Sequence, residues 1–139
     1  MKKTDMTSEI TFRVGDLPAV EALVRLRESV GWSGGYAAVF ERYSTTVSAY
    51  SADEELIGWT ALVSDGVRHA FFVDVIVDPL HQGRGIGREL VTRAIDVEQA
   101  RGISLFHADF AKENAPFYAA CGFTLCGGAY LDTACSVTL

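Results

Sequence analysis

The stretch that decides the fold is Asp78-Pro79-Leu80-His81-Gln82-Gly83-Arg84-Gly85-Ile86-Gly87-Arg88. It follows a nearly continuous apolar run, 71–77, which predicts a strand buried on both faces. It precedes an amphipathic pattern that predicts a helix from Gly87 to about Arg101. A glycine-rich turn in this position lets main-chain N–H groups approach a bound anion, and Arg84 and Arg88 add positive charge. The stretch therefore predicts a diphosphate-binding turn.

Two common nucleotide-binding turns do not match this spacing. A P-loop ends in Gly-Lys-Ser/Thr, whereas this turn continues as Gly87-Arg88-Glu89. A dinucleotide fingerprint that starts at Gly83 needs glycine at position 88, which is arginine. One that starts at Gly85 needs glycine at position 90, which is leucine. Both alternatives are excluded.

The rest of the chain predicts a mixed sheet with helices between some of its strands. An antiparallel meander is expected from the alternating patterns and polar turns between positions 46 and 77. Asp16 is the expected cap of a first helix that Gly31 ends. The predicted strands are 10–14, 47–50, 56–63, 67–77, 103–107, 123–126 and 134–139, and the predicted helices are 16–30, 36–43, 87–101 and 114–121.

Composition limits the classes of function. With 139 residues, 49% of them hydrophobic, the chain is long enough for one core, and we expect a single domain over residues 1–139. The formal net charge of −6 argues against nucleic acid as a partner and weakly favours cationic small molecules such as amines.

The N-terminal segment and the cysteines predict the compartment. Residues 1–9 lack the apolar core of a signal peptide, and no run reaches the length of a membrane span. Three cysteines without CxxC spacing suit a reducing compartment and argue against a metal site. We expect a cytoplasmic protein that binds neither membrane nor metal.

The segment from Gln82 to Gly87 resembles the acetyl-CoA signature of the GNAT (GCN5-related N-acetyltransferase) superfamily, Gln/Arg-x-x-Gly-x-Gly/Ala. The resemblance extends upstream through 74–79 and downstream through 114–123, which resembles the family's stretch ending in Tyr-x-x-x-Gly-Phe. It implies an α/β (α+β) fold with a mixed, mostly antiparallel twisted sheet of six to seven strands and about four helices. It also implies an N-acetyltransferase that moves the acetyl group of acetyl-CoA to a primary amine.

The resemblance also implies where the cofactor lies. In the family, the pantetheine arm inserts between the strand before the turn and the strand that follows the helix. The main chain of Val75 and Val77 would then pair with the arm, and the N–H groups from Gln82 to Arg88 would hold the pyrophosphate. Asn114 would contact the cofactor or cap the helix that follows it. The complete implied cofactor set is Val75, Ile76, Val77, Gln82, Gly83, Arg84, Gly85, Ile86, Gly87, Arg88, Asn114 and Phe117.

Two residues are candidates for the chemistry. An alkylammonium must lose a proton before it attacks a thioester, and Asp74 interrupts the apolar strand where burial would raise its basicity. A structural or substrate-orienting carboxylate, or deprotonation through water, remains an alternative. Tyr118 matches the tyrosine that protonates the departing thiolate in many family members, and an aromatic that only packs is its alternative.

The acceptor side is less specified by the sequence. By the resemblance, Trp32, Ser33 and Tyr36 would bound it, although Trp32 could equally be a core anchor. The acceptor could be a polyamine, an amino acid, an aminoglycoside or a peptide N-terminus. A non-catalytic acyl-CoA-binding or regulatory domain is the alternative function, and a pure interaction protein is a third. A terminal strand at 134–139 could form a homodimer.

Overall fold

The computed structural model describes residues 9–33 and 42–134. The chain divides into two compact units, residues 1–108 and residues 109–139, and each unit is described by itself. The helix expected at 36–43 and the strand expected at 134–139 lie almost entirely outside the described residues. The expectation of a single domain stays a prediction.

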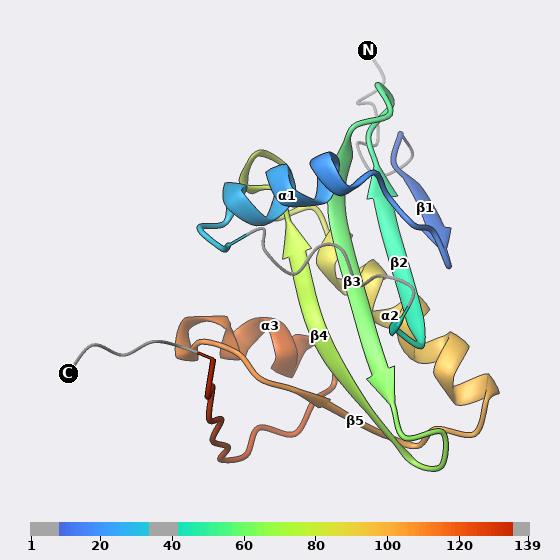
Figure 1. The fold of residues 1–139 in the computed structure, drawn as a ribbon, viewed down its shortest axis with the longest axis vertical. Helices are drawn as coiled ribbons and strands as arrows, with labels where there is room; N and C mark the ends of the chain where they lie inside the picture. The colour runs from blue at the N-terminus through green and yellow to red at the C-terminus, as the bar shows by residue number, and fades with distance from the viewer. Residues whose placement is uncertain (1–8, 34–41, 135–139) are drawn as a thin grey trace. The chain divides into compact units, whose positions relative to one another are not determined.

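The described residues of the first unit form a five-stranded sheet and two α-helices (Figure 1). The strands lie in the order β1-β2-β3-β4-β5, the first four pair antiparallel, and β5 pairs parallel with β4. The predicted antiparallel meander is therefore confirmed. The elements are β1 (Thr11–Val14), α1 (Val20–Ser29), β2 (Thr45–Tyr50), β3 (Leu56–Ser64), β4 (His69–Val77), the 3₁₀ turn η2 (Pro79–His81), α2 (Ile86–Ala100) and β5 (Leu105–Ala108).

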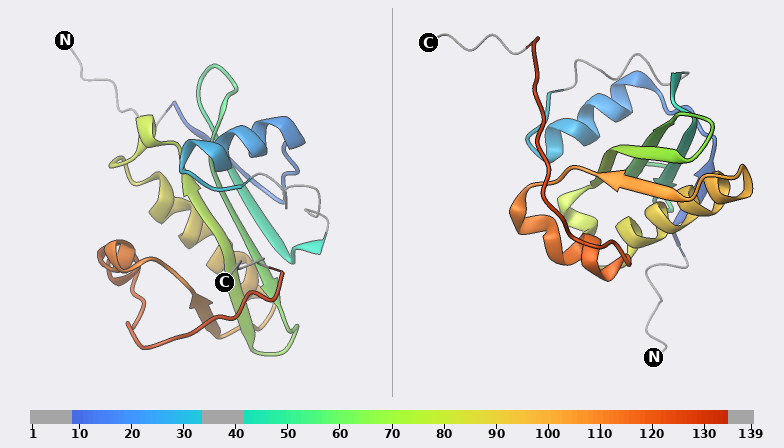
Figure 2. Two further views of the ribbon diagram at one scale, coloured as in Figure 1. Left: turned by 60° about the vertical axis from the view of Figure 1, so that its left-hand side comes forward. Right: turned by 90° about the horizontal axis from the view of Figure 1, so that it is seen from below.

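The two helices cover opposite faces of this sheet (Figure 2, right). Leu23 and Leu26 of α1 pack with Trp59, Ala61 and Ile76 in one buried cluster. Gly58 faces the other way, because a Cβ built on it would lie 3.1 Å from Ile86 Cγ2 and 3.1 Å from Leu90 Cδ1 of α2. A side chain at position 58 would therefore push the first turns of α2 away from the sheet.

β4 is interrupted by a bulge at Val73. Ala61 pairs with Asp74 and the next residue, Leu62, pairs with Phe72, so Val73 is the extra residue of the longer strand. The strand is not buried on both faces as expected, since Phe71 is 46% and Val73 43% exposed. The buried cluster under α1 contains Trp59, Ala61 and Ile76 and includes neither Phe71 nor Val73.

The expected cap of the first helix is wrong. α1 begins at Val20 after Ala19, and no side chain caps it. Asp16 instead accepts a hydrogen bond on Oδ2 from the Tyr50 hydroxyl at 2.5 Å, and its main-chain oxygen accepts one from Thr46 Oγ1 at 2.8 Å. These contacts with β2 hold Asp16 in the connection ahead of the helix.

The second unit contains the 3₁₀ turn η3 (Lys112–Asn114) and α3 (Ala115–Ala120). α3 ends at Ala120, and Gly122, which follows the C-cap residue Cys121, has φ of 91°. The strand expected at 123–126 is not formed, because no described segment pairs with it and Leu125 stays 49% exposed. Across the described residues the fold has five strands and three α-helices, which corrects the expected six to seven strands and four helices.

The described helices are not of the kind that spans a bilayer. None of those in residues 9–33 and 42–134 is both long and apolar enough to cross a membrane.

Candidate functional site

The first part of the site is the open edge of β4. The parallel ladder with β5 covers only His69–Phe72, so no described strand pairs with Val73–Val77 on that side. The Asp78 N–H donates to the Ile57 oxygen at 2.8 Å, which makes Gly58 and Val77 a non-hydrogen-bonded pair. The N–H and C=O groups of Val77, and of Val75 two residues earlier, therefore point away from β3. An extended ligand can pair with them as an added strand.

The second part is the turn between β4 and α2. Asp78 Oδ1 accepts from the Leu80 N–H at 2.8 Å, and Gln82 Nε2 donates to the Val77 oxygen at 2.9 Å, which joins the turn to the end of β4. Gly83 and Gly85 have φ of 79° and 81°, and nothing lies within 4 Å of a Cβ built on either. Both positions need a left-handed backbone that side chains rarely adopt.

The amides of this turn are available to hydrogen-bond an anion. Among the described residues, none accepts a hydrogen bond from the N–H groups of Gly83 to Arg88, and the α2 N-terminus has no side-chain cap. The helix dipole places partial positive charge there. Arg84 contacts His81, with 3.4 Å between Nη1 and Nδ1, whereas Arg88 is exposed and has no ion-pair partner in the described part of the chain. These groups fit a diphosphate.

The third part is Asp74, which lies next to the bulge and is 7% exposed. Its Oδ2 accepts a hydrogen bond from Arg27 Nη1 of α1 at 2.7 Å, and the two side chains are only 7% and 11% exposed. The Asp74 main-chain oxygen accepts a bond from Thr60 Oγ1 at 2.7 Å. The carboxylate is therefore charge-paired in the described structure, which supports the alternative that Asp74 orients a group.

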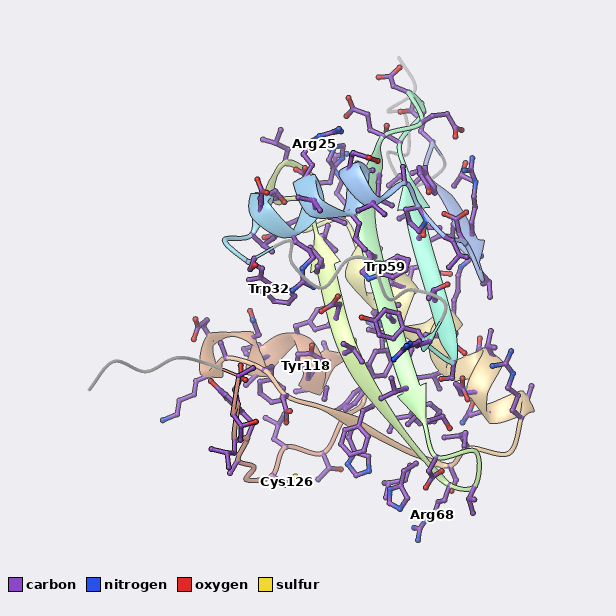
Figure 3. The ribbon with its side chains drawn as sticks, viewed as in Figure 1. Arg25, Trp32, Trp59, Arg68, Tyr118 and Cys126 are labelled. Atoms are coloured by element: carbon purple, nitrogen blue, oxygen red, sulfur yellow. The ribbon has the colours of Figure 1, made fainter. Side chains whose placement is uncertain are left out.

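The corner after α1 lies beside this ion pair. The Arg27 guanidinium stacks over Trp32, 5.4 Å from the ring centroid, and Arg27 Nε donates to the Ser33 oxygen at 2.6 Å. Trp32 is 42% exposed and is not a core anchor; the buried tryptophan is Trp59 (Figure 3). Tyr36 lies outside the described residues. Burial, and secondly the charge of Asp74, raise the pKa of Tyr43.

Asn114, Phe117 and Tyr118 lie in the second unit. Tyr118 stacks on Phe110 with 4.6 Å between ring centroids and contacts Phe117 and Phe123 edge-on. Burial, and secondly the neighbouring Cys121, raise the pKa of Tyr118 to about 12. Asn114 occupies the N-cap position of α3, but its side chain makes no capping hydrogen bond. The capping interpretation of Asn114 is therefore not supported.

Sequence reasoning missed Arg27 and Tyr43. Arg27 follows Leu26 directly and lies four residues after Leu23, so it is a charged residue at the edge of the apolar stripe of α1. A charge in that position needs a buried partner, so the sequence does contain a signal that Arg27 is paired. Nothing comparable marked Tyr43, because its neighbours along the chain are polar.

The arrangement contains no recognisable metal centre. Within residues 9–33 and 42–134, no group of three or more His, Cys, Asp or Glu side chains could hold an ion. His69 and His107 come together with 2.9 Å between Nδ1 and Nε2, but they form a pair only.

Comparisons with known proteins agree with this arrangement. A family model described as the acetyltransferase (GNAT) family matches residues 17–123. The chain is 32% identical over 138 residues to a streptothricin acetyltransferase of Streptomyces lavendulae, which covers 95% of this chain and 71% of the relative. It is 31% identical over 81 residues to an L-methionine sulfoximine/L-methionine sulfone acetyltransferase of Salmonella typhimurium, covering 58% of this chain and 44% of that relative.

The fold is similar to that of solved structures. A GNAT-family acetyltransferase from Streptococcus pneumoniae superimposes with a TM-score of 0.76 at 23% identity, covering 89% of this chain and 98% of that one. At this identity the likeness concerns the fold alone.

Proposed function

The chain belongs to the GNAT family of acetyltransferases, and from that premise we propose that it transfers the acetyl group of acetyl-CoA to a primary amine of a small molecule or peptide. The transfer is a direct attack of the amine on the thioester in a ternary complex. Acetyl-CoA supplies the activated acyl group. The chain's residues bind it, orient the amine and stabilise the thiolate that leaves.

One observation carries the proposal. The open edge of β4 at Val75 and Val77 leads directly into a turn whose amides, from Gly83 to Arg88, have no acceptor among the described residues. An extended amide-containing arm that ends in a diphosphate has hydrogen-bonding groups of the right kind for both parts. Because Gln82 already occupies the Val77 oxygen, the groups left for the arm are the Val77 N–H and both main-chain groups of Val75.

Two side chains are proposed for the chemistry. Asp74 orients the amine or receives its proton through water, since its Oδ2 is engaged with Arg27. Tyr118 stabilises the departing thiolate. With a pKa of about 12 its phenol stays protonated at neutral pH. A thiol has an ordinary pKa of about 8.5, so donation of a hydrogen bond costs less than full transfer of the proton.

The names of the relatives suggest an acceptor class. One relative is named for streptothricin and the other for L-methionine sulfoximine and L-methionine sulfone, which are small molecules that carry an amine. We propose that the acceptor here is a small-molecule amine of this kind.

The test is a thiol-release assay with acetyl-CoA. Streptothricin, L-methionine sulfone, L-lysine and spermidine serve as acceptors, and wild type is compared with Tyr118→Phe. We expect release with at least one amine and a kcat lowered by about 10- to 100-fold in Tyr118→Phe, with unchanged affinity for CoA. The rate should not fall at alkaline pH through Tyr118, because its phenol stays neutral below a pKa of about 12.

Three outcomes separate the candidate functions. Release that depends on an amine supports the transferase. Thermal stabilisation by CoA without release for any amine indicates a non-catalytic acyl-CoA-binding domain. A protein that CoA does not stabilise at all contradicts both.

A further inference from the structure

Arg27 is a largely buried cation to which the proposed function assigns no role of its own. It projects from α1 toward the sheet, where it pairs with Asp74 beside the β4 bulge, and its side chain is 11% exposed. A buried arginine costs free energy unless its donors are matched by acceptors of good geometry. Its contacts therefore indicate which parts of the molecule it holds together.

These three contacts reach two segments, β4 at Asp74 and the corner at Trp32 and Ser33. Nη1 donates to Asp74 Oδ2 at 2.7 Å, Nε donates to the Ser33 main-chain oxygen at 2.6 Å, and the guanidinium plane lies over the Trp32 ring at 5.4 Å. The planar fork of arginine has donors at two fixed angles, so one side chain can set the carboxylate and the corner relative to each other. A lysine ammonium could donate to the Asp74 carboxylate or to the Ser33 oxygen, but it could not make both of these bonds and also stack on Trp32.

The described hydrogen bonds of the Asp74 side chain engage only one of its two carboxylate oxygens. Arg27 engages Oδ2, and no described residue donates to Oδ1 of Asp74. A carboxylate that is fixed through one oxygen presents the other in a defined direction, which suits a hydrogen bond from an ammonium or amine N–H. The half-exposed ring of Trp32, which contacts the same Arg27 guanidinium, offers an apolar or π surface to the body of the same ligand.

We propose that Arg27 is the positioning residue of the acceptor site: it fixes Asp74 through Oδ2 and holds the Trp32–Ser33 corner, so that Oδ1 and the Trp32 ring receive an amine together. The inference rests on the proposed function for the identity of the ligand as an amine. The clamp itself rests only on contacts within the first unit.

The variants are Arg27→Met, which removes the charge and keeps an unbranched side chain, and Arg27→Lys, which keeps the charge without the fork. Arg25→Met is the matched control, because Arg25 lies on the same helix, is exposed, and has no described partner (Figure 3). Each variant is first shown to be folded by its thermal transition.

The first measurement needs no activity. The chain has two tryptophans, of which Trp59 is 0% exposed and Trp32 is 42% exposed, so acrylamide quenching of fluorescence reports mainly on Trp32. We expect Arg27→Met to change the quenching constant by about twofold as the cation leaves the ring, with Arg25→Met matching wild type. An unchanged quenching constant in Arg27→Met overturns the clamp.

The second measurement separates binding of the amine from binding of CoA. With the best acceptor of the thiol-release assay, Arg27→Met should raise the KM for the amine by about tenfold or more, since a hydrogen bond to a charged group is misplaced. The affinity for CoA should stay that of wild type, and Arg27→Lys should recover part of the KM. Adding Asp74→Asn to Arg27→Met should raise the KM for the amine little further, because both substitutions disturb the same contact between Asp74 and the amine.

The results distinguish this inference from the proposed function. A folded Arg27→Met with wild-type KM for the amine, or one whose KM change is matched by Arg25→Met, contradicts the positioning role while leaving the transferase intact. A wild-type protein that acetylates no amine contradicts the proposed function, and the quenching comparison then decides the clamp by itself.

Discussion

The two turns at the ends of β4 both contain left-handed glycines and an arginine, but they differ in whether their main-chain N–H groups have hydrogen-bond acceptors. The turn 64–69 before the strand has Gly66 at φ of 74° and Arg68 at its tip, and the turn 78–88 after the strand has Gly83 and Gly85 at φ of 79° and 81°. Asp65 Oδ1 accepts from the N–H groups of Val67, Arg68 and His69 at 2.8 to 3.0 Å. No described residue does this for Gly83 to Arg88.

The difference separates a structural turn from the turn that we propose binds CoA. Exposed main-chain amides that are already satisfied by a carboxylate are unavailable to a ligand, whereas unsatisfied amides at a helix N-terminus attract an anion. A left-handed glycine or an exposed arginine alone does not distinguish the two. The two turns are distinguished by whether their main-chain N–H groups already have an acceptor.

The largest expected effect comes from a matched pair of glycine substitutions. Gly85→Val should weaken CoA binding by about 100-fold or more, because valine resists the left-handed backbone and the surrounding amides turn away from the phosphates. Gly66→Val puts a similar strain into the other turn and should leave CoA affinity unchanged. Isothermal titration with CoA measures both, and equal affinities for the two variants would contradict the comparison.

The second effect concerns the packing that places the binding turn. Gly58 pairs with Val77 and lies against Ile86 and Leu90, so Gly58→Val should lower the free energy of unfolding by about 1 to 3 kcal/mol through overpacking. CoA affinity should fall as the α2 N-terminus shifts. Urea denaturation with and without CoA provides the check, and full wild-type stability would show that α2 does not pack as described.

The third effect compares the arginines of the two turns. Arg88→Ala should weaken CoA binding by about tenfold at low salt and by less at high salt, since the guanidinium is exposed and screened. Arg68→Ala, at the other end of β4 (Figure 3), is the control and should leave CoA affinity as in wild type. A salt-independent loss in Arg88→Ala, or an equal loss in both variants, would indicate that charge at this turn is not what binds the phosphates.

The smallest effect is confined to the structural turn. Three main-chain hydrogen bonds lower the pKa of Asp65 to about 2. Because this pKa is depressed, the turn keeps the three bonds at pH values above the ordinary pKa of aspartate. It loses them as the pH falls through about 2. Asp65→Ala should speed hydrogen exchange of the Val67, Arg68 and His69 amides several-fold while leaving CoA affinity unaltered. Slow exchange at these amides in Asp65→Ala would show that the carboxylate does not hold the turn.

Much of the fold could be predicted from local patterns. The meander, α2 and α3 follow from alternation, helical periodicity and glycine ends, which are properties of neighbouring residues. Asp16 was misassigned because its partners, Thr46 and Tyr50, are 30 and 34 residues away. The strand at 123–126 was predicted from alternation alone, but alternation cannot supply a partner strand.

The candidate site likewise has one part that neighbouring residues predict and one part that depends on residues distant in the chain. The glycine-rich turn is encoded in consecutive residues, so its position and its free amides could be predicted. The pairing of Asp74 could not, because its partner Arg27 lies 47 residues away in the chain. The sequence leaves Trp32 as either an acceptor-site residue or a core anchor, and its 42% exposure in the structure excludes the core.

The measurement that tests the central claim most directly is a titration of ¹⁵N-labelled protein with CoA, followed through its amide resonances. The account predicts large shift changes for the N–H groups of Gly83 to Arg88 and little change for those of Gly66 to His69. Unchanged resonances in the 83–88 turn at saturating CoA would contradict it.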